Sequence, residues 1–225
     1  MNFFRKNKHL TVVTIHGFGT KASREMTPLS DYLRKQGYHV VQFDIFDPAD
    51  ESDTETEKWI ERCEDRLRSE LKKKDPVVLL GFSMGGVIAS YLASVFPVKA
   101  LILVAPAFQY FDFSKLQKAG LSLLSAGSGS SKGSSMTMDQ NKAFMRIIST
   151  YKNSIAHVDC PVLILHGTED EVIQPRSSHT AFGLIPHEQK RLVFIEGGKH
   201  RMLYDGKVEK LCFDLIRDML SGDLM

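Results

Sequence analysis

Short runs of apolar residues recur along the chain and alternate with segments of helical periodicity. Each run is rich in β-branched residues and is short enough to be a strand that is buried on both faces. The runs are residues 11–15, 40–43, 77–80, 100–104, 162–165 and 192–195. Strands that alternate with helices predict an α/β fold, with a mostly parallel six-stranded sheet and helices on both faces. Any ligand site in such a sheet is expected just beyond the carboxyl ends of the strands.

The clearest helical segment covers residues 54–74. Its apolar residues recur every three or four positions and form one stripe that faces the core. These residues are Ile60, Cys63, Leu67 and Leu71. Thr54 followed by Glu57 predicts a capping box at the start of this helix, and Pro76 follows its end.

The alternation is interrupted between Ala105 and Pro161, where more than fifty residues stand in place of a single crossover helix. We therefore expect a core formed by residues 1–105 and 161–225, with a cap or lid inserted at 106–160. The insertion opens with aromatic residues, continues through a Ser/Gly-rich stretch at 125–135 that we expect to be flexible, and ends in a helix near Phe144. Its aromatic residues either cover an apolar substrate or dock the insertion on the core.

Composition narrows the class of function. With 43% hydrophobic and 25% charged residues the chain is typical of a globular protein, and a net charge of +2 creates no field that favours nucleic acid. No apolar stretch approaches the roughly 20 residues that span a bilayer, and residues 10–15 are too few and too polar for a signal-peptide core. Three cysteines, far apart and odd in number, suggest neither a disulfide framework nor a metal site. We expect a cytoplasmic protein without stable membrane insertion.

One motif carries candidate chemistry. The sequence G-F-S-M-G at 81–85 matches G-x-S-x-G, directly after an expected strand and directly before a good helical stretch. So tight a turn strains the backbone of Ser83 and projects its hydroxyl over the sheet edge. A serine hydroxyl is a poor nucleophile until a base takes its proton. His200 is the favoured base, because it follows the last expected strand in a glycine-containing loop. The other histidines considered for this role are His157, His166, His179 and His187.

These motifs, in this order, resemble the α/β-hydrolase superfamily, and in particular its serine esterases and lipases, over residues 16–200. The resemblance implies a minimal α/β-hydrolase fold with a small cap. The H-G-F-G loop at 16–19 looks like the oxyanion loop of that family, which implies that the backbone N–H groups of Phe18 and Met84 form the oxyanion hole. Asp170 stands in the place of the family's acid, with Glu169 and Glu171 as competitors.

The resemblance implies acyl transfer by a catalytic triad of Ser83, Asp170 and His200. Ser83 attacks an ester carbonyl, His200 moves the proton and water releases the acyl group, so no metal or cofactor is required. We expect the enzyme to cleave carboxylic esters of small or medium uncharged substrates, so its expected partner is a small-molecule acyl ester and not nucleic acid. The sequence leaves the oligomeric state open. Candidate substrate contacts are Phe108, Tyr110, Phe111 and Val172.

Two other functions stay open on the sequence. The same triad would serve an acyl-thioesterase or an amide hydrolase, and the scaffold also suits a non-catalytic binding protein, although such a protein is expected to lose a triad residue. The chain departs from many relatives after the second expected strand, where F-D-I-F-D-P-A-D replaces a G-H-G-like loop. Its carboxylates either rim the site and disfavour anionic substrates or form a solvated acidic loop. They are Asp47, Asp50, Glu51 and Asp53.

Overall fold

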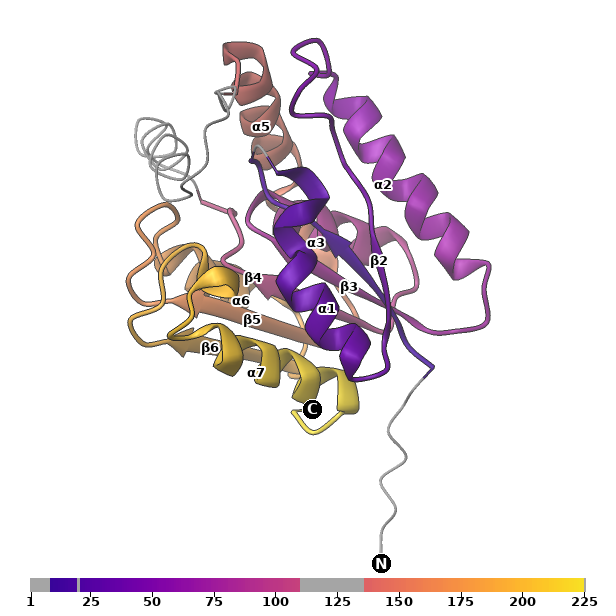
Figure 1. Cartoon of the computed structure of the whole chain (residues 1–225), viewed down its shortest axis with the longest axis vertical. Helices are drawn as coiled ribbons and strands as arrows, with labels where there is room; N and C mark the ends of the chain where they lie inside the picture. The colour runs from indigo at the N-terminus through magenta and orange to yellow at the C-terminus, as the bar shows by residue number, and fades with distance from the viewer. Residues whose placement is uncertain (1–8, 20, 110–135, 225) are drawn as a thin grey trace, which may run out of the picture.

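A computed structural model describes residues 9–19, 21–109 and 136–224 of the chain (Figure 1). Within these residues, six strands form one sheet in the order β2-β1-β3-β4-β5-β6, and each neighbouring pair is parallel. The strands are β1 (Thr11–Ile15), β2 (His39–Gln42), β3 (Val77–Phe82), β4 (Ala100–Val104), β5 (Val162–Gly167) and β6 (Lys190–Ile195). The predicted six-stranded α/β fold is confirmed. The strand order reverses between β1 and β3, the place where such sheets bind ligands.

Helices connect the strands and cover both faces of the sheet. The α-helices are α1 (Thr27–Lys35), α2 (Thr56–Leu71), α3 (Met84–Val95), α5 (Met138–Tyr151), α6 (Arg176–Leu184) and α7 (Glu209–Ser221). The short 3-10 helices are η1 (Ala22–Met26), η2 (Ser154–His157) and η3 (Met202–Tyr204). Helices α1 and α7 lie together in front of the sheet in Figure 1. Helices α2, α3, α5 and α6 contribute to the core on the other face.

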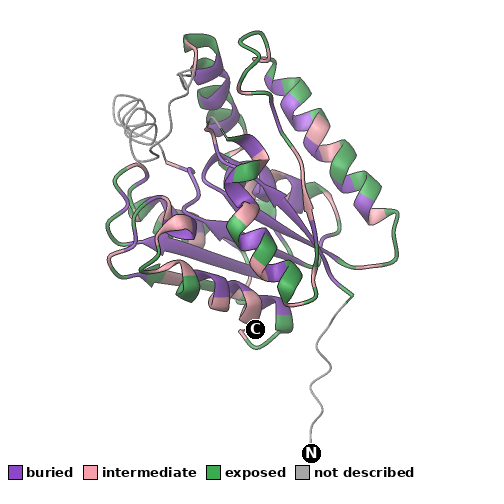
Figure 2. Cartoon of the chain, viewed as in Figure 1, coloured by how far each residue is buried: buried purple, intermediate pink, exposed green. Residues whose placement is uncertain are grey.

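The core is divided by the sheet into two clusters, because alternate residues of a strand point to opposite faces. In β1, Val13 faces the cluster shared with α2, α3 and α5, whereas Val12 faces the cluster shared with α1 and α7. Leu79 and Leu80 in β3 divide in the same way. Figure 2 shows the central strands buried and the helices exposed on their outer sides. Burial on both faces explains why these strands read as continuous apolar runs.

The predicted start of α2 is wrong. The helix begins at Thr56, its N-cap residue Glu55 makes no side-chain capping bond, and no capping box forms with Thr54. Residues 53 and 54 stay outside the helix because the carboxylate of Asp53 is bound to the preceding loop and accepts the backbone N–H of Asp47 at 2.9 Å. A capping box does form at the start of α5. There the Thr137 hydroxyl and the Gln140 side chain each accept the other residue's backbone N–H.

The expected insertion at 106–160 is described only in part. Its Ser/Gly-rich stretch at 125–135 lies outside the described residues, so the cap stays a prediction. Its described part contains α5 and η2, and residues Phe144, Ile147 and Ile148 of α5 are buried in the same core cluster as α3. No helix among residues 9–19, 21–109 and 136–224 is long and apolar enough to cross a membrane.

Candidate active site

The carboxyl ends of three strands bring together the side chains that the sequence singled out. Ser83 follows β3 directly, Asp170 lies three residues beyond β5, and His200 lies five residues beyond β6. His200 Nε2 is 3.2 Å from Ser83 Oγ, and His200 Nδ1 is 2.9 Å from Asp170 Oδ2. All three residues are buried. A hydroxyl, an imidazole and a carboxylate therefore form one hydrogen-bonded relay.

Ser83 occupies a sharp turn between β3 and α3. Its backbone has φ 53° and ψ −117°, a region that is essentially open only to glycine. A Cβ atom on Gly81 would collide with the backbone of Gly85, and one on Gly85 would collide with the backbone of Ile15. Both glycines are therefore needed for the turn to pass its neighbours. The result is a serine side chain raised above the sheet edge at the N-terminus of α3, where the helix dipole favours negative charge.

The partners of His200 determine its tautomer. Nδ1 faces the Asp170 carboxylate and therefore donates to it, which leaves the lone pair of Nε2 directed at the Ser83 hydroxyl. Burial alone would raise the pKa of Asp170, but the polar and electrostatic contacts with the His166 and His200 rings hold that pKa well below its usual range. Asp170 is consequently ionised, and His200 is oriented to accept a proton.

The loop after β1 is held in place by His16 and Phe18. His16 Nδ1 donates to the carbonyl oxygen of Gly17 at 2.7 Å, and Nε2 accepts the backbone N–H of Ile45 at 2.9 Å. Burial lowers the pKa of His16 to about 4, so the ring is neutral and serves as a brace. The Phe18 ring stacks on Phe144 of α5, with centroids 5.0 Å apart. Within the described residues, no hydrogen bond is donated by the backbone N–H of Phe18 or of Met84.

Glu25, in η1, is a buried carboxylate beside this loop that the sequence analysis missed. Its Oε2 accepts the backbone N–H of Gly17 at 3.1 Å, and its residue exposure is only 6%. Burial raises the pKa of Glu25, whereas the charges of Arg201 and His200 and the bond from Gly17 lower it. No motif surrounds Glu25 in the sequence. Its place in the site follows only from the packing of η1 against β1.

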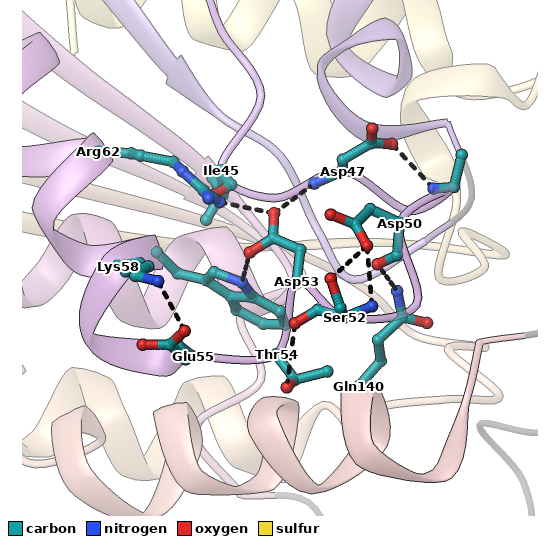
Figure 3. Close-up of polar contacts among 12 residues, drawn as sticks. Ile45, Asp47, Asp50, Ser52, Asp53, Thr54, Glu55, Lys58, Arg62 and Gln140 are labelled. Carbon is teal, nitrogen blue, oxygen red and sulfur yellow. Dashed lines mark hydrogen bonds and ion pairs between the residues drawn. The ribbon is translucent and has the colours of Figure 1, made fainter.

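The acidic loop after β2 proves to be structural at Asp53. The side chain of Asp53 is 8% exposed and accepts three hydrogen bonds, from the Asp47 backbone N–H, the Arg62 guanidinium and the Trp59 indole (Figure 3). The interpretation as a solvated carboxylate is wrong for this residue, because its side chain is buried and paired. Asp47, Asp50 and Glu51 are exposed, and their place at the rim of the site stays a prediction. The loop also contacts the insertion, because Gln140 of α5 donates to the backbone carbonyl of Asp50 at 3.2 Å.

The candidate substrate contacts are only partly placed. Phe108 is 4% exposed and belongs to the core cluster that includes Met84, and Val172 packs against that cluster. Tyr110 and Phe111 lie outside the described residues. Across the described ranges, no group of three or more His, Cys, Asp or Glu side chains is arranged to hold a metal ion.

Comparison with family models assigns the class of protein. A model described as "alpha/beta hydrolase fold" matches residues 11–125, just over half of the chain, and one described as "Serine aminopeptidase, S33" matches residues 132–207. The chain belongs to the α/β-hydrolase family. The predicted α/β-hydrolase class is thereby confirmed, and a curated lipase relative supports the predicted hydrolase type.

Individual relatives agree with this class. Among curated proteins, the thermostable monoacylglycerol lipase of Bacillus sp. (strain H-257) is 24% identical over 217 residues, which cover 88% of this chain and 85% of the relative. A solved structure of metagenome-derived lipolytic enzymes superposes with a TM-score of 0.77 at 20% identity, over 94% of this chain and 93% of the other. The monoacylglycerol lipase of Paleococcus ferrophilus superposes with a TM-score of 0.71 at 18% identity, over 94% of each chain. Both structures share the fold of this chain.

Proposed function

We propose that this protein is a serine carboxylesterase that cleaves carboxylic esters of small or medium uncharged substrates through an acyl-enzyme on Ser83. The observation that carries the proposal is the continuous relay from Ser83 Oγ to His200 Nε2 at 3.2 Å and from His200 Nδ1 to Asp170 Oδ2 at 2.9 Å. Such a relay activates a serine hydroxyl that is otherwise a poor nucleophile.

The proposed reaction has two stages. In the first, Ser83 Oγ attacks the ester carbonyl as His200 takes the hydroxyl proton, and the tetrahedral intermediate collapses when His200 returns that proton to the leaving alcohol. In the second, His200 deprotonates a water molecule that attacks the acyl-enzyme, and the acid product leaves while Ser83 regains its proton. Asp170 stays ionised throughout and orients the imidazole. These roles follow from the donor and acceptor directions in the relay.

The oxyanion of each intermediate is assigned to the backbone N–H groups of Phe18 and Met84. Met84 is the first residue of α3, and Phe18 lies in the loop that His16 and Glu25 hold against the Ser83 turn. An ideal Cβ on Gly17 would lie only 3.1 Å from the Cβ of Ser83, so this loop approaches the nucleophile closely. Removing one such donor typically raises the barrier by about 3 kcal/mol.

An uncharged, largely apolar substrate is favoured by the residues around the relay. Phe18, Phe108 and Val172 all pack in or against the cluster that contains Met84. We assign these side chains to the wall of the proposed acyl site, where they favour a substrate whose apolar surface they bury. The sequence relative that is a monoacylglycerol lipase agrees with an acyl ester as the substrate class.

The experiment that tests the proposal is labelling with a fluorophosphonate probe, followed by a panel of p-nitrophenyl esters of increasing acyl length. We expect one label on Ser83, none in Ser83→Ala, and unchanged labelling in Ser94→Ala. Ser94 is a suitable control because it lies near the end of the same helix, and its hydroxyl donates to the Tyr91 carbonyl. An unlabelled wild-type protein with no esterase activity refutes the proposal and leaves a non-catalytic binding protein.

An amide hydrolase is the second candidate, because the serine aminopeptidase model matches residues 132–207. The same triad serves esters, thioesters and amides. Matched p-nitroanilides and acyl-thioesters, assayed beside the esters, separate the three. A kcat/KM for a p-nitroanilide above that for the corresponding ester assigns the amide activity.

A further inference from the structure

The chain places a second imidazole beside the acid of the relay. His166 lies in β5, four residues before Asp170, and its ring is fully buried. Its Nε2 is 3.1 Å from Asp170 Oδ2, the same oxygen that accepts from His200 Nδ1. We propose that His166 is a positioning residue that fixes the Asp170 carboxylate and weakens its attraction for a protonated His200. This inference rests on the proposed function and deepens it.

The surroundings of the His166 ring determine which nitrogen carries hydrogen. Nε2 is 2.9 Å from the carbonyl oxygen of Ile173 and also faces the Asp170 carboxylate, and both of these oxygens can only accept. Nε2 therefore carries a hydrogen. Nδ1 is 2.6 Å from Ser178 Oγ in α6, and in the neutral ring it accepts the hydroxyl hydrogen. Ser178 thus stabilises the tautomer whose Nε2–H bonds the Ile173 carbonyl and lies 3.1 Å from Asp170 Oδ2.

Donors then surround both oxygens of Asp170. Oδ1 accepts the backbone N–H groups of Val172 and Ile173 at 2.9 and 2.8 Å, and Oδ2 faces His200 and His166. The Asp170 side chain is fully buried, so bulk solvent does not reach it. Because His166 shares the negative charge of Oδ2, the carboxylate stabilises a proton on His200 less than it would without this neighbour.

Loss of the His166 N–H is therefore expected to raise the midpoint of the His200 titration by about half to one pH unit, the effect of one hydrogen bond. The rise of kcat/KM with pH is expected to move to higher pH by the same amount, because only the unprotonated imidazole acts as a base. Asp170 is the group through which a substitution at 166 acts on His200. The other polar groups that face or adjoin His200 form no hydrogen bond with His166 in the described part of the chain and keep their identity; they are Ser83, Glu25, Glu171 and Arg201.

The test compares His166→Gln with His166→Asn in the full chain. Both variants place a neutral amide at the site, but only the longer glutamine can reach Asp170 in the way that Nε2 does. The His200 titration is followed by NMR on protein with isotope-labelled histidine, and its signal is assigned from its loss in His200→Gln. His187→Asn is the control, because His187 lies in the loop before β6, at the opposite edge of the sheet.

We expect the His200 midpoint to rise in His166→Asn, and to stay near the wild-type value in His166→Gln and in the control. If the His200 midpoint is the same in both His166 variants, the inference is overturned, whether or not that midpoint differs from the wild-type value. If Tm falls but the midpoint does not change, His166 has a purely structural role. If neither variant folds, Ser178→Ala is the deciding variant. Removing the Ser178 hydroxyl weakens the preference for an N–H at His166 Nε2, so the His200 midpoint should rise by a smaller amount. The absence of any rise overturns the inference.

These readouts separate the inference from the proposed function. The NMR titration needs no turnover, whereas the catalytic assignment is tested by fluorophosphonate labelling of Ser83 in the wild-type protein. A protein that is not labelled, but whose His200 midpoint shifts, loses the catalytic assignment and keeps the positioning contact. If the protein is labelled but its His200 midpoint does not shift, the catalytic assignment holds and the positioning role of His166 is refuted. When both hold, the pH profile of kcat/KM moves with the NMR midpoint.

Discussion

Ser83 should make the folded protein less stable than glycine at the same position would. With φ 53° and ψ −117°, the residue occupies a region that a Cβ atom makes unfavourable, at a cost of about 1–3 kcal/mol. Ser83→Gly relieves this strain, whereas Ser83→Ala removes the hydroxyl and keeps the Cβ. The two variants therefore differ in two ways: the backbone strain of residue 83 in the folded protein, and the conformational entropy of residue 83 in the unfolded chain.

The magnitude follows from these two opposing effects. Glycine gives the unfolded chain more conformational entropy than alanine, which lowers the free energy of unfolding by about 0.4–1 kcal/mol. Subtracting this from the strain leaves Ser83→Gly more stable than Ser83→Ala by up to about 2.5 kcal/mol, with a central value of about 1.3 kcal/mol. In a chain of this length, each kcal/mol corresponds to about 2–4 °C in Tm.

Thermal and urea unfolding of the two variants measure this difference. The control pair is Ser149→Gly and Ser149→Ala at an exposed position in α5, where ordinary helix propensity makes glycine the less stable of the two by about 1 kcal/mol. The sign should therefore invert between positions 149 and 83. If Ser83→Gly is no more stable than Ser83→Ala, the backbone of this turn is not strained and the reasoning fails.

Two further predictions concern buried carboxylates. Burial raises the pKa of Glu25, so folded protein binds its proton more readily than the unfolded chain, and stability is lost as pH rises above the ordinary carboxyl value of about 4.5. The free energy of unfolding of Glu25→Gln, measured in urea relative to the wild-type protein, should therefore be higher at pH 8 than at pH 4. The same difference between variant and wild type at both pH values contradicts this. Asp53→Ala leaves the Trp59 indole and the Arg62 guanidinium without this acceptor and should lower the free energy of unfolding by about 1–3 kcal/mol. The control is Asp65→Ala at an exposed position, and unfolding is followed by Trp59 fluorescence. Equal losses of unfolding free energy in the two variants refute the structural role of Asp53.

Local sequence patterns were sufficient for the strands and for the turn at Ser83. Continuous apolar runs at 77–80 and 162–165 predict strands that are buried on both faces, and β3 and β5 are such strands. The turn at 81–85 follows from its glycines, which collide with nearby backbone if a Cβ is added. Helix boundaries were predicted less well. The expected cap at Thr54 failed because a tertiary contact, the bond from the Asp47 N–H to Asp53, holds that part of the chain in the loop.

The sequence by itself determined the order of strands and helices, and with it the edge of the sheet at which Ser83, Asp170 and His200 meet, because parallel strands all end at one edge. Only the tertiary structure decided which further groups act on them. His166 lies beside Asp170, and Glu25 holds Gly17, through contacts that depend on how η1 and α6 pack against the sheet. A hydrogen bond needs two atoms within about 3 Å and correctly aligned. Periodicity predicts which face a residue occupies, but not that distance.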